Sequence, residues 1–185
     1  MVLATNAVAT VGAGVRPSRR LSARSKLLGL ALVAAIGLGF QSLRHWHDTH
    51  AIMINASESL PNWAFLVETG RFPARGEYVA FTPGKDPLTV KHFGSPPEPF
   101  IKRAYGLPGD VVSHRGADVL VNGTPVARMK PLTRQGEVLR PGPVGVVPRD
   151  CIFAATPHKD GFDSRYAAIG FVCKRQLVGV GVSIL

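Results

Sequence analysis

A lysine in an apolar stretch is the first residue of this chain that could do chemistry. Lys102 lies in residues 100–105 (FIKRAY), ahead of a turn-forming Gly-Leu-Pro-Gly segment. A lysine is ordinarily a charged surface group with a pKa near ~10.4, and apolar surroundings disfavour its charged form and lower that pKa. A neutral amine can take a proton from a nucleophile at pH 7. The residues around Lys102 therefore predict a general base.

Two serines ahead of a proline are the candidate nucleophiles. Ser57 and Ser59 follow the apolar run of residues 51–55 (AIMIN), and Pro61 follows them. Strand alternation predicts that both hydroxyls point to one face, and a proline that cannot donate a ladder hydrogen bond ends the strand. The alternative is that both hydroxyls only bond to the local backbone at a turn. The presence of Lys102 favours a nucleophile.

A polar segment, residues 158–166 (HKDGFDSRY), supplies a third group. Asp163 and Arg165 can form a salt bridge that fixes a turn, and Asp163 can orient a catalytic side chain. An ordinary polar surface loop has the same composition. A Ser-His-Asp arrangement with His92 or His158 as the base is a further alternative, although no motif surrounds either histidine.

The charge of the chain is concentrated at its beginning. The net charge is +10 over 185 residues, and five basic residues without any acidic one precede residue 27. The remaining chain keeps 17 basic against 12 acidic residues. The high isoelectric point therefore reflects in part a basic arm, and because no recognition motif accompanies it, we expect no nucleic-acid partner.

An uncharged apolar run, residues 27–43, follows the basic arm. As a helix it covers about 25 Å, and Trp46 can extend the span to the membrane interface. The preceding basic residues predict a cytoplasmic N-terminus. We therefore predict a basic arm (1–26), a transmembrane signal-anchor (27–44) and an extracytoplasmic domain (45–185). A cleaved signal peptide is the alternative.

Three histidines and an aspartate follow the apolar run. His45, His47 and His50 surround Asp48, and such residues can bind a metal. Their spacing does not place the histidines on one face of a helix, which favours a polar segment at the membrane exit. We predict neither a metal site nor a cofactor.

Short apolar runs between glycines and prolines predict an all-β domain of short strands and long loops. Asn122-Gly123 between apolar residues is the strongest hairpin signal. We expect loops at residues 83–99 and 127–149, and strands at residues 51–55, 76–82, 100–105, 110–113, 118–126, 150–155, 171–173 and 177–184.

The chain has two cysteines, Cys151 and Cys173. In an extracytoplasmic domain a disulfide between them is allowed. It would close a loop of about twenty residues around Asp163 and stabilise the fold by roughly 3 kcal/mol. Their spacing leaves open whether they pair.

Three stretches together resemble the signal peptidase I family, membrane-anchored serine proteases with a Ser-Lys dyad. Residues 101–110 (IKRAYGLPGD) are similar to the family's lysine motif, and residues 163–166 (DSRY) to the end of its third motif. The family's serine motif is Ser-x-x-Pro, whereas residues 59–61 (SLP) have one residue fewer before the proline. This shortened pattern, and the Asn-x-Ser-x-Ser-x-Pro run from Asn55, resemble the conjugative-transfer signal peptidases of the TraF type, which process pilin precursors.

The resemblance implies a role for five residues. Ser59 would be the nucleophile and Lys102 the general base. The Ser57 hydroxyl and the backbone N–H of Ser59 would form the oxyanion hole. Asp163 and Arg165 would be the supporting pair, and the TraF-type branch assigns the aspartate a catalytic role beside the dyad.

The chain departs from the family at one position. The family usually has a lysine-positioning serine two residues before the aspartate, and here that position is Gly161. Lys102 would then need another partner, such as the Ser164 hydroxyl, a backbone carbonyl or water.

The resemblance implies a serine endopeptidase, with its catalytic domain in the periplasm, that removes signal or pro-peptides from exported precursors. Conjugative pilin is the first expectation for its substrate, and some relatives release a cyclised product. A general signal peptidase I is one alternative. A non-catalytic membrane-tethered assembly protein of a conjugation or secretion apparatus is another. A self-cleaving repressor-type protease lacks support, because no pattern for DNA-binding helices precedes the domain.

Overall fold

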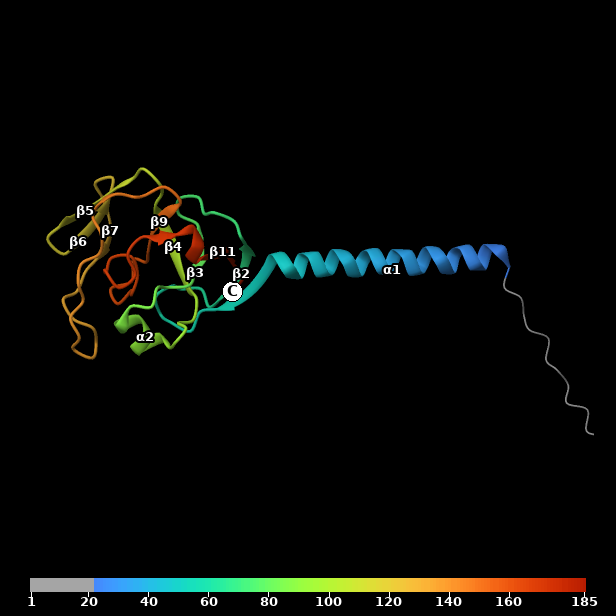
Figure 1. Ribbon diagram of the computed structural model, residues 1–185, viewed down its shortest axis with the longest axis horizontal. Coiled ribbons are helices and arrows are strands. Elements are labelled where there is room, and N and C mark those ends of the chain that lie inside the picture. The colour runs from blue at the N-terminus through green and yellow to red at the C-terminus, as the bar shows by residue number, and fades with distance from the viewer. Residues whose placement is uncertain (1–21) are drawn as a thin grey trace, which may run out of the picture. The chain divides into compact units, whose positions relative to one another are not determined.

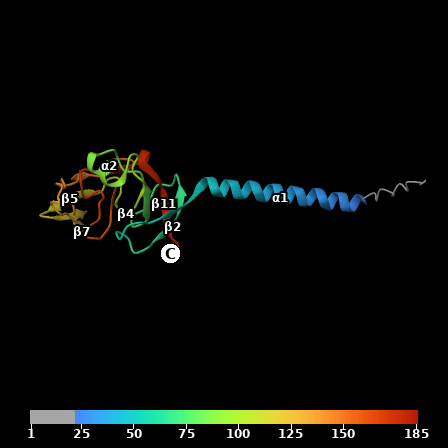
Figure 2. The same cartoon turned by 90° about the horizontal axis from the view of Figure 1, so that it is seen from below.

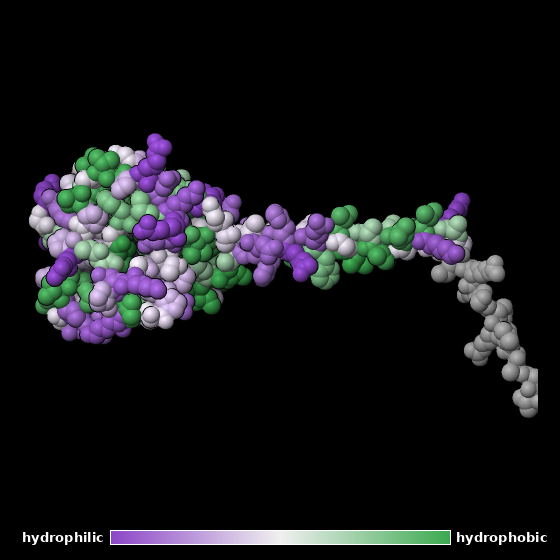
Figure 3. Space-filling model, in the orientation of Figure 1, coloured by the Kyte–Doolittle hydropathy of each residue, from purple (hydrophilic) through white to green (hydrophobic). Residues whose placement is uncertain are grey.

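The computed structural model describes residues 22–185, and its first element is the helix α1 (Ala23–Thr49). This helix is long and apolar enough to cross a membrane by length and composition, and none of its residues is buried in the protein. Figure 3 shows apolar residues along the helix and hydrophilic residues at both its ends. Of the predicted arm, residues 1–21 lie outside the described residues.

The chain divides between Leu43 and Arg44 into two units, and the second contains all the strands. Its larger sheet is antiparallel, with the strand order β1-β2-β11-β3-β4-β9-β10 (Figure 1). The strands in that order are β1 (His50–Ile54), β2 (Ala64–Thr69), β11 (Leu177–Ser183), β3 (Tyr78–Phe81), β4 (Phe100–Gly106), β9 (Cys151–Ala155) and β10 (Val172–Cys173).

A second antiparallel sheet has the order β7-β6-β5-β8. Figure 2 shows β5 and β7 at the end of this unit opposite to β2 and β11. The strands are β7 (Thr124–Arg128), β6 (Asp118–Val121), β5 (Val111–Arg115) and β8 (Gly145–Val146). The predicted hairpin joins β6 to β7, and both turn residues have positive φ, 49° at Asn122 and 79° at Gly123. This is the backbone of the turn that Asn-Gly favours.

The all-β prediction is confirmed, with three corrections. Residues 83–99 contain the short helix α2 (Pro87–Phe93) where we expected only a loop. Asp86 begins it, because its carboxylate accepts a hydrogen bond from the N–H of Leu88, and Pro87 occupies a position where helices tolerate proline. The strand β2 was not predicted either. Residues 127–149, where we also expected only a loop, contain the two-residue strand β8, which is held by its pairing with β5. A short 3-10 helix, η1 (Lys174–Gln176), precedes β11.

Three apolar clusters form the core of the β unit. One lies between β3, β4 and β9, and a second lies between the smaller sheet and β9. The third contains Leu60, Phe65, Val67, Ala80 and Ile101. Leu60 is only 5% exposed, and burying a leucine contributes roughly 2 kcal/mol. Because it follows Ser59 directly, Leu60 attaches the serine-containing turn to the core.

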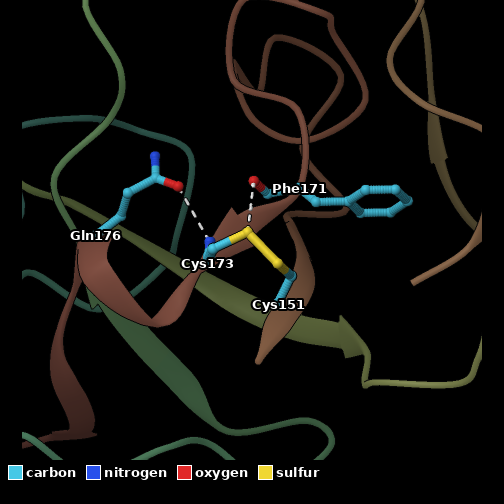
Figure 4. Close-up of a disulfide and its surroundings, with 4 residues drawn as sticks. All are labelled: Cys151, Phe171, Cys173 and Gln176. Atoms are coloured by element: carbon cyan, nitrogen blue, oxygen red, sulfur yellow. Dashed lines mark hydrogen bonds between the residues drawn. A yellow bond between two sulfur atoms is a disulfide. The ribbon is translucent and has the colours of Figure 1, made fainter. Parts of the chain in front are cut away.

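A disulfide joins Cys151 on β9 to Cys173 on β10, which are paired residues of neighbouring strands (Figure 4). The bond closes the segment that contains Asp163 and Arg165. It also holds the short edge strand β10 on the sheet, where two residues alone provide little ladder pairing.

Candidate active site

Ser57 and Ser59 lie in the turn between β1 and β2. The strand ends at Ile54, so the serines are turn residues and not the end of the strand that the sequence predicted. Their hydroxyl oxygens lie 2.8 Å apart, and Ser57 donates a hydrogen bond of 2.9 Å from its hydroxyl to Asn55 Oδ1. The turn, and not strand alternation, brings the two hydroxyls together.

Lys102 reaches this turn from β4. Its Nζ donates a hydrogen bond of 2.9 Å to Ser59 Oγ, and the lysine is only 6% exposed. Phe100 and Ala104 share its face of the strand, and buried Val79 is its partner on β3. The sequence thus correctly placed this lysine in apolar surroundings.

Burial lowers the pKa of Lys102 from 10.5 to about 8, because the charged ammonium is poorly solvated in this position. The negative charge of Asp163 raises the pKa in part, and the positive charge of Arg165 lowers it. A considerable fraction of the amine is therefore neutral near pH 8, in direct contact with a serine hydroxyl.

Ser59 is the hydrogen-bond partner of the Lys102 amine among residues 22–185. The nitrogen also lies 5.6 Å from the centre of the Phe100 ring. Ser164 is not its partner, since the Ser164 hydroxyl accepts from the N–H of Ala154. No backbone carbonyl of the described residues accepts a hydrogen bond from the Lys102 amine.

Asp163 and Arg165 form a fully buried ion pair, with both side chains 0% exposed. Arg165 donates from Nε to Asp163 Oδ1 and from Nη2 to Asp163 Oδ2, each over 2.8 Å. The same guanidinium donates to the carbonyls of Arg128, His158 and Thr156. Asp163 also accepts from the N–H of Thr156. Within residues 22–185 its carboxylate bonds to neither Lys102 nor Ser59, so its effect on the lysine is electrostatic.

Gly161 leaves room for this ion pair. A Cβ added there would lie 2.5 Å from Thr156 Oγ1, 2.6 Å from Arg165 Nη2 and 2.8 Å from Asp163 Oδ2. Contacts below 3.0 Å require these atoms to move, and all three belong to the buried network. The space of a serine side chain at this position is thus already occupied by the ion pair and Thr156.

Neither candidate histidine bonds to a serine in the described part of the chain. His92 Nε2 lies 3.3 Å from Glu137, and His158 Nδ1 accepts from the N–H of Asp160. Residues 22–185 contain no cluster of three or more His, Cys, Asp or Glu side chains arranged to hold a metal. Among the described residues, Lys102 and neither of these histidines lies within hydrogen-bond distance of Ser59.

Two cavities meet at the serines. A cavity of about 770 Å³ is lined mainly by apolar residues of β1 and the start of β4, together with Lys102. A second, of about 530 Å³, is lined by polar residues of the 130–139 and 158–162 segments. Ser57 and Ser59 belong to the walls of both. An extended peptide crossing Ser59 would therefore find room on both sides of this serine.

The 130–139 segment forms a wall of the polar cavity. Lys130 and Arg134 both bind the carboxylate of Asp160. Lys91 of α2 binds Glu137 from the other side. No role was predicted for this segment, because the partners of its charged residues lie up to 46 residues away along the chain.

A family model described as "Signal peptidase, peptidase S26" matches residues 25–185. The chain belongs to this signal peptidase family. It is 30% identical over 161 residues to a probable conjugal transfer protein TraF of Sinorhizobium fredii, across 80% of this chain and 84% of the relative. It is 36% identical over 114 residues to a probable signal peptidase I-2 of Synechocystis, but across only 59% of this chain and 46% of the relative.

Among solved structures, a signal peptidase I from Enterococcus faecalis is similar to this signal peptidase at 23% identity and a TM-score of 0.38. The match covers 60% of this chain and 97% of the other. Family membership rests on the sequence match, and serine peptidase activity is the activity of the family.

Proposed function

We propose that this signal peptidase is a membrane-anchored serine endopeptidase in which Ser59 is the nucleophile and Lys102 the general base. The observation that carries the proposal is the 2.9 Å hydrogen bond between a buried lysine amine and a serine hydroxyl. A serine is a weak nucleophile until an adjacent base takes its proton. Lys102 is in contact with Ser59, and its pKa is lowered to about 8.

In the proposed reaction, neutral Lys102 takes the proton of Ser59 as Ser59 Oγ attacks the scissile carbonyl. The Ser59 N–H and the Ser57 hydroxyl donate to the resulting oxyanion. Lys102 then gives its proton to the leaving amine, and an acyl-enzyme remains on Ser59. Lys102 next activates the water that hydrolyses this ester. The distance of 2.8 Å between the two hydroxyl oxygens supports a role of Ser57 at this place.

Asp163 and Arg165 support the dyad without touching it in this proposal. The charge of Asp163 acts on Lys102, and the ion pair fixes the segment beside the dyad. The Ser164 hydroxyl accepts a hydrogen bond from Ala154 of β9 and so helps to fix the same segment.

We propose that the substrate is an exported precursor protein. A conjugative pilin-like protein is the first candidate. The TraF relative, similar over most of both chains, supports conjugation. The apolar cavity beside Ser59 suits the segment of a signal peptide before the cut. The Synechocystis relative favours a second candidate, a general signal peptidase I.

We also propose that α1 anchors the protein in the inner membrane, with the catalytic unit in the periplasm. Its length and composition suit a membrane span, and the disulfide suits an oxidising compartment. The basic residues before the apolar run support a cytoplasmic N-terminus.

The test is processing of precursors by the full-length protein in liposomes. A pilin precursor and a secretory preprotein are incubated separately, and the products are weighed by mass spectrometry. We expect cleavage of the pilin precursor, and a mass one water below the trimmed chain would reveal a ring. Ser59→Ala should abolish cleavage, whereas Ser113→Ala, an exposed serine on β5, should not. Cleavage that persists in Ser59→Ala would refute the dyad, and preference for the preprotein would select the general peptidase.

A further inference from the structure

The Asn55 side chain is the centre of the hydrogen bonding in the serine-containing turn. Its Oδ1 accepts from the Ser57 N–H over 3.1 Å and from the Ser57 hydroxyl over 2.9 Å. Its Nδ2 donates to the carbonyls of Leu60 and Asn62, over 3.3 and 3.0 Å. One amide therefore bonds to the turn both before and after Ser59.

The direction of these bonds fixes the protons of the two serines. An amide oxygen only accepts, so the single hydroxyl hydrogen of Ser57 points to Asn55. In the contact between the hydroxyls, Ser59 must then be the donor to Ser57. The resting turn thus holds Ser57 as an acceptor for Ser59.

The donor side of the amide closes the shortened turn. Leu60 and Asn62 flank Pro61, which has no N–H to contribute to the turn. By holding both carbonyls, Asn55 fixes the backbone on the far side of Ser59. Within residues 22–185 the Asn55 side chain bonds to neither Ser59 nor Lys102, so it can act on the reaction only through the residues that it holds.

We propose that Asn55 is a positioning residue for peptide-bond cleavage, whose side-chain amide holds the Ser57 hydroxyl where it can donate to the oxyanion of the precursor. This inference rests on the proposed function of Ser59 and Lys102. As negative charge develops on the carbonyl oxygen, the Ser57 hydroxyl hydrogen turns from Asn55 Oδ1 to that oxygen. The Ser57 N–H keeps its bond to Asn55, so the backbone of Ser57 stays in place.

The first test compares Asn55→Ala with Asn62→Ala in the precursor assay. Asn62 is the matched control, because it is an asparagine of the same turn whose side chain accepts from the Tyr78 hydroxyl and not from Ser57. We expect Asn55→Ala to lower kcat ~10²-fold, as a misplaced catalytic donor does. KM should change less than about twofold, since ground-state binding is not touched. Asn62→Ala should keep kcat within about threefold of wild type. Equal losses of kcat in both variants would reduce Asn55 to a structural residue of the turn.

The second test is a double-mutant cycle with Ser57→Ala. If Asn55 acts through the Ser57 hydroxyl, then Asn55→Ala should cost less than about threefold in kcat once that hydroxyl is absent. Effects that multiply would overturn the proposal.

Asn55→Asp keeps the shape of the side chain, so it provides a folded variant if Asn55→Ala unfolds. It retains an acceptor for Ser57 but turns an oxygen to the two carbonyls and adds negative charge beside the oxyanion. We expect kcat to fall at least ~10²-fold, and a folded Asn55→Asp protein with wild-type kcat would contradict the inference. Failure of the wild-type protein to cleave any precursor would instead contradict the proposed function.

Discussion

Lys102 and Arg165 are two buried cations of the same unit with opposite surroundings. Arg165 is 0% exposed, and its guanidinium donates to a carboxylate and to three backbone carbonyls. Lys102 is 6% exposed, and among residues 22–185 its amine has one hydrogen-bond partner, the hydroxyl of Ser59. Both groups are shielded from water, but only the Arg165 guanidinium has several hydrogen-bond acceptors around it.

Under the proposed function, this difference separates a structural cation, Arg165, from a reactive amine, Lys102. The bonds of Arg165 replace the solvent that its guanidinium lost, and they fix the 156–165 segment. The single neutral partner of Lys102 does not replace solvent, so the amine loses its proton more readily. Four predictions, in order of decreasing effect, test this contrast.

Lys102→Met should have the largest effect. Removing the base should lower cleavage at least ~10⁴-fold, as the loss of one member of a catalytic unit typically does. The fold should persist, because an apolar chain of similar length replaces an amine with few partners. Precursor processing and thermal unfolding, with the exposed Lys85→Met as control, measure both. Cleavage by a folded Lys102→Met protein would contradict the role of Lys102 as the general base.

Asp163→Ala should act mainly on stability. It leaves the Arg165 guanidinium buried without its counter-ion, and breaking a buried ion pair in this way typically costs about 3–5 kcal/mol of stability. Urea unfolding is the measurement. Asp118→Ala removes the carboxylate of an exposed pair with Arg128 and should cost less than about 1 kcal/mol. Equal changes in the two variants would show that burial does not distinguish these pairs.

The pH dependence tests the amine directly. Only neutral Lys102 accepts a proton, so kcat/KM, which reports groups of the free enzyme, should rise about tenfold per pH unit up to the Lys102 pKa of about 8 and then level off. Between about 8 and 10.5 the unfolded chain binds more protons at this lysine than the folded one. Stability from this group should therefore increase with pH across that window. A kcat/KM that is flat between pH 6 and 8 would contradict the assignment, and the stability of Lys102→Met should lack this pH-dependent contribution.

Gly161→Ser should have the smallest effect, and its direction is informative. The added Cβ meets Thr156, Asp163 and Arg165 below 3.0 Å, so we expect a loss of about 1–3 kcal/mol from overpacking. Gly84→Ser, where nothing lies within 4 Å of the added Cβ, is the matched control and should change stability by less than about 0.5 kcal/mol. A more stable Gly161→Ser protein with higher kcat would mean that the Asp163–Arg165 ion pair can move to make room for a hydroxyl that positions Lys102.

Local patterns were sufficient to predict the apolar surroundings of Lys102 and one hairpin, whereas the candidate roles of the serines and of Asp163 came from the resemblance to a family. The apolar neighbours of Lys102 and the Asn122-Gly123 turn are properties of adjacent residues, and both correspond to the structure. The strand β2, which lies between β1 and β11, lacks strict alternation, because its neighbouring residues Ala64 and Phe65 are both buried. The signal for α2 was present in Asp86 and Pro87, but the surrounding glycines and prolines favoured a loop.

The occupant of the space beside Gly161 could not be predicted, because it depends on the fold around Arg165. The role of Asn55 could have been suspected from sequence, since an asparagine two residues before a serine is typical of a side-chain-capped turn. Its bonds across Pro61 required the structure.

The position of β11 has a consequence for the time at which this site can form. β11 is the last strand in chain order, yet it lies between β2, which follows the turn with Ser59, and β3, which pairs with the strand of Lys102. A growing chain that ends before residue 177 contains Ser59 and Lys102 but lacks the strand that joins their halves of the sheet. The larger sheet can therefore be completed around these two residues only after residues 177–183 have been added to the chain.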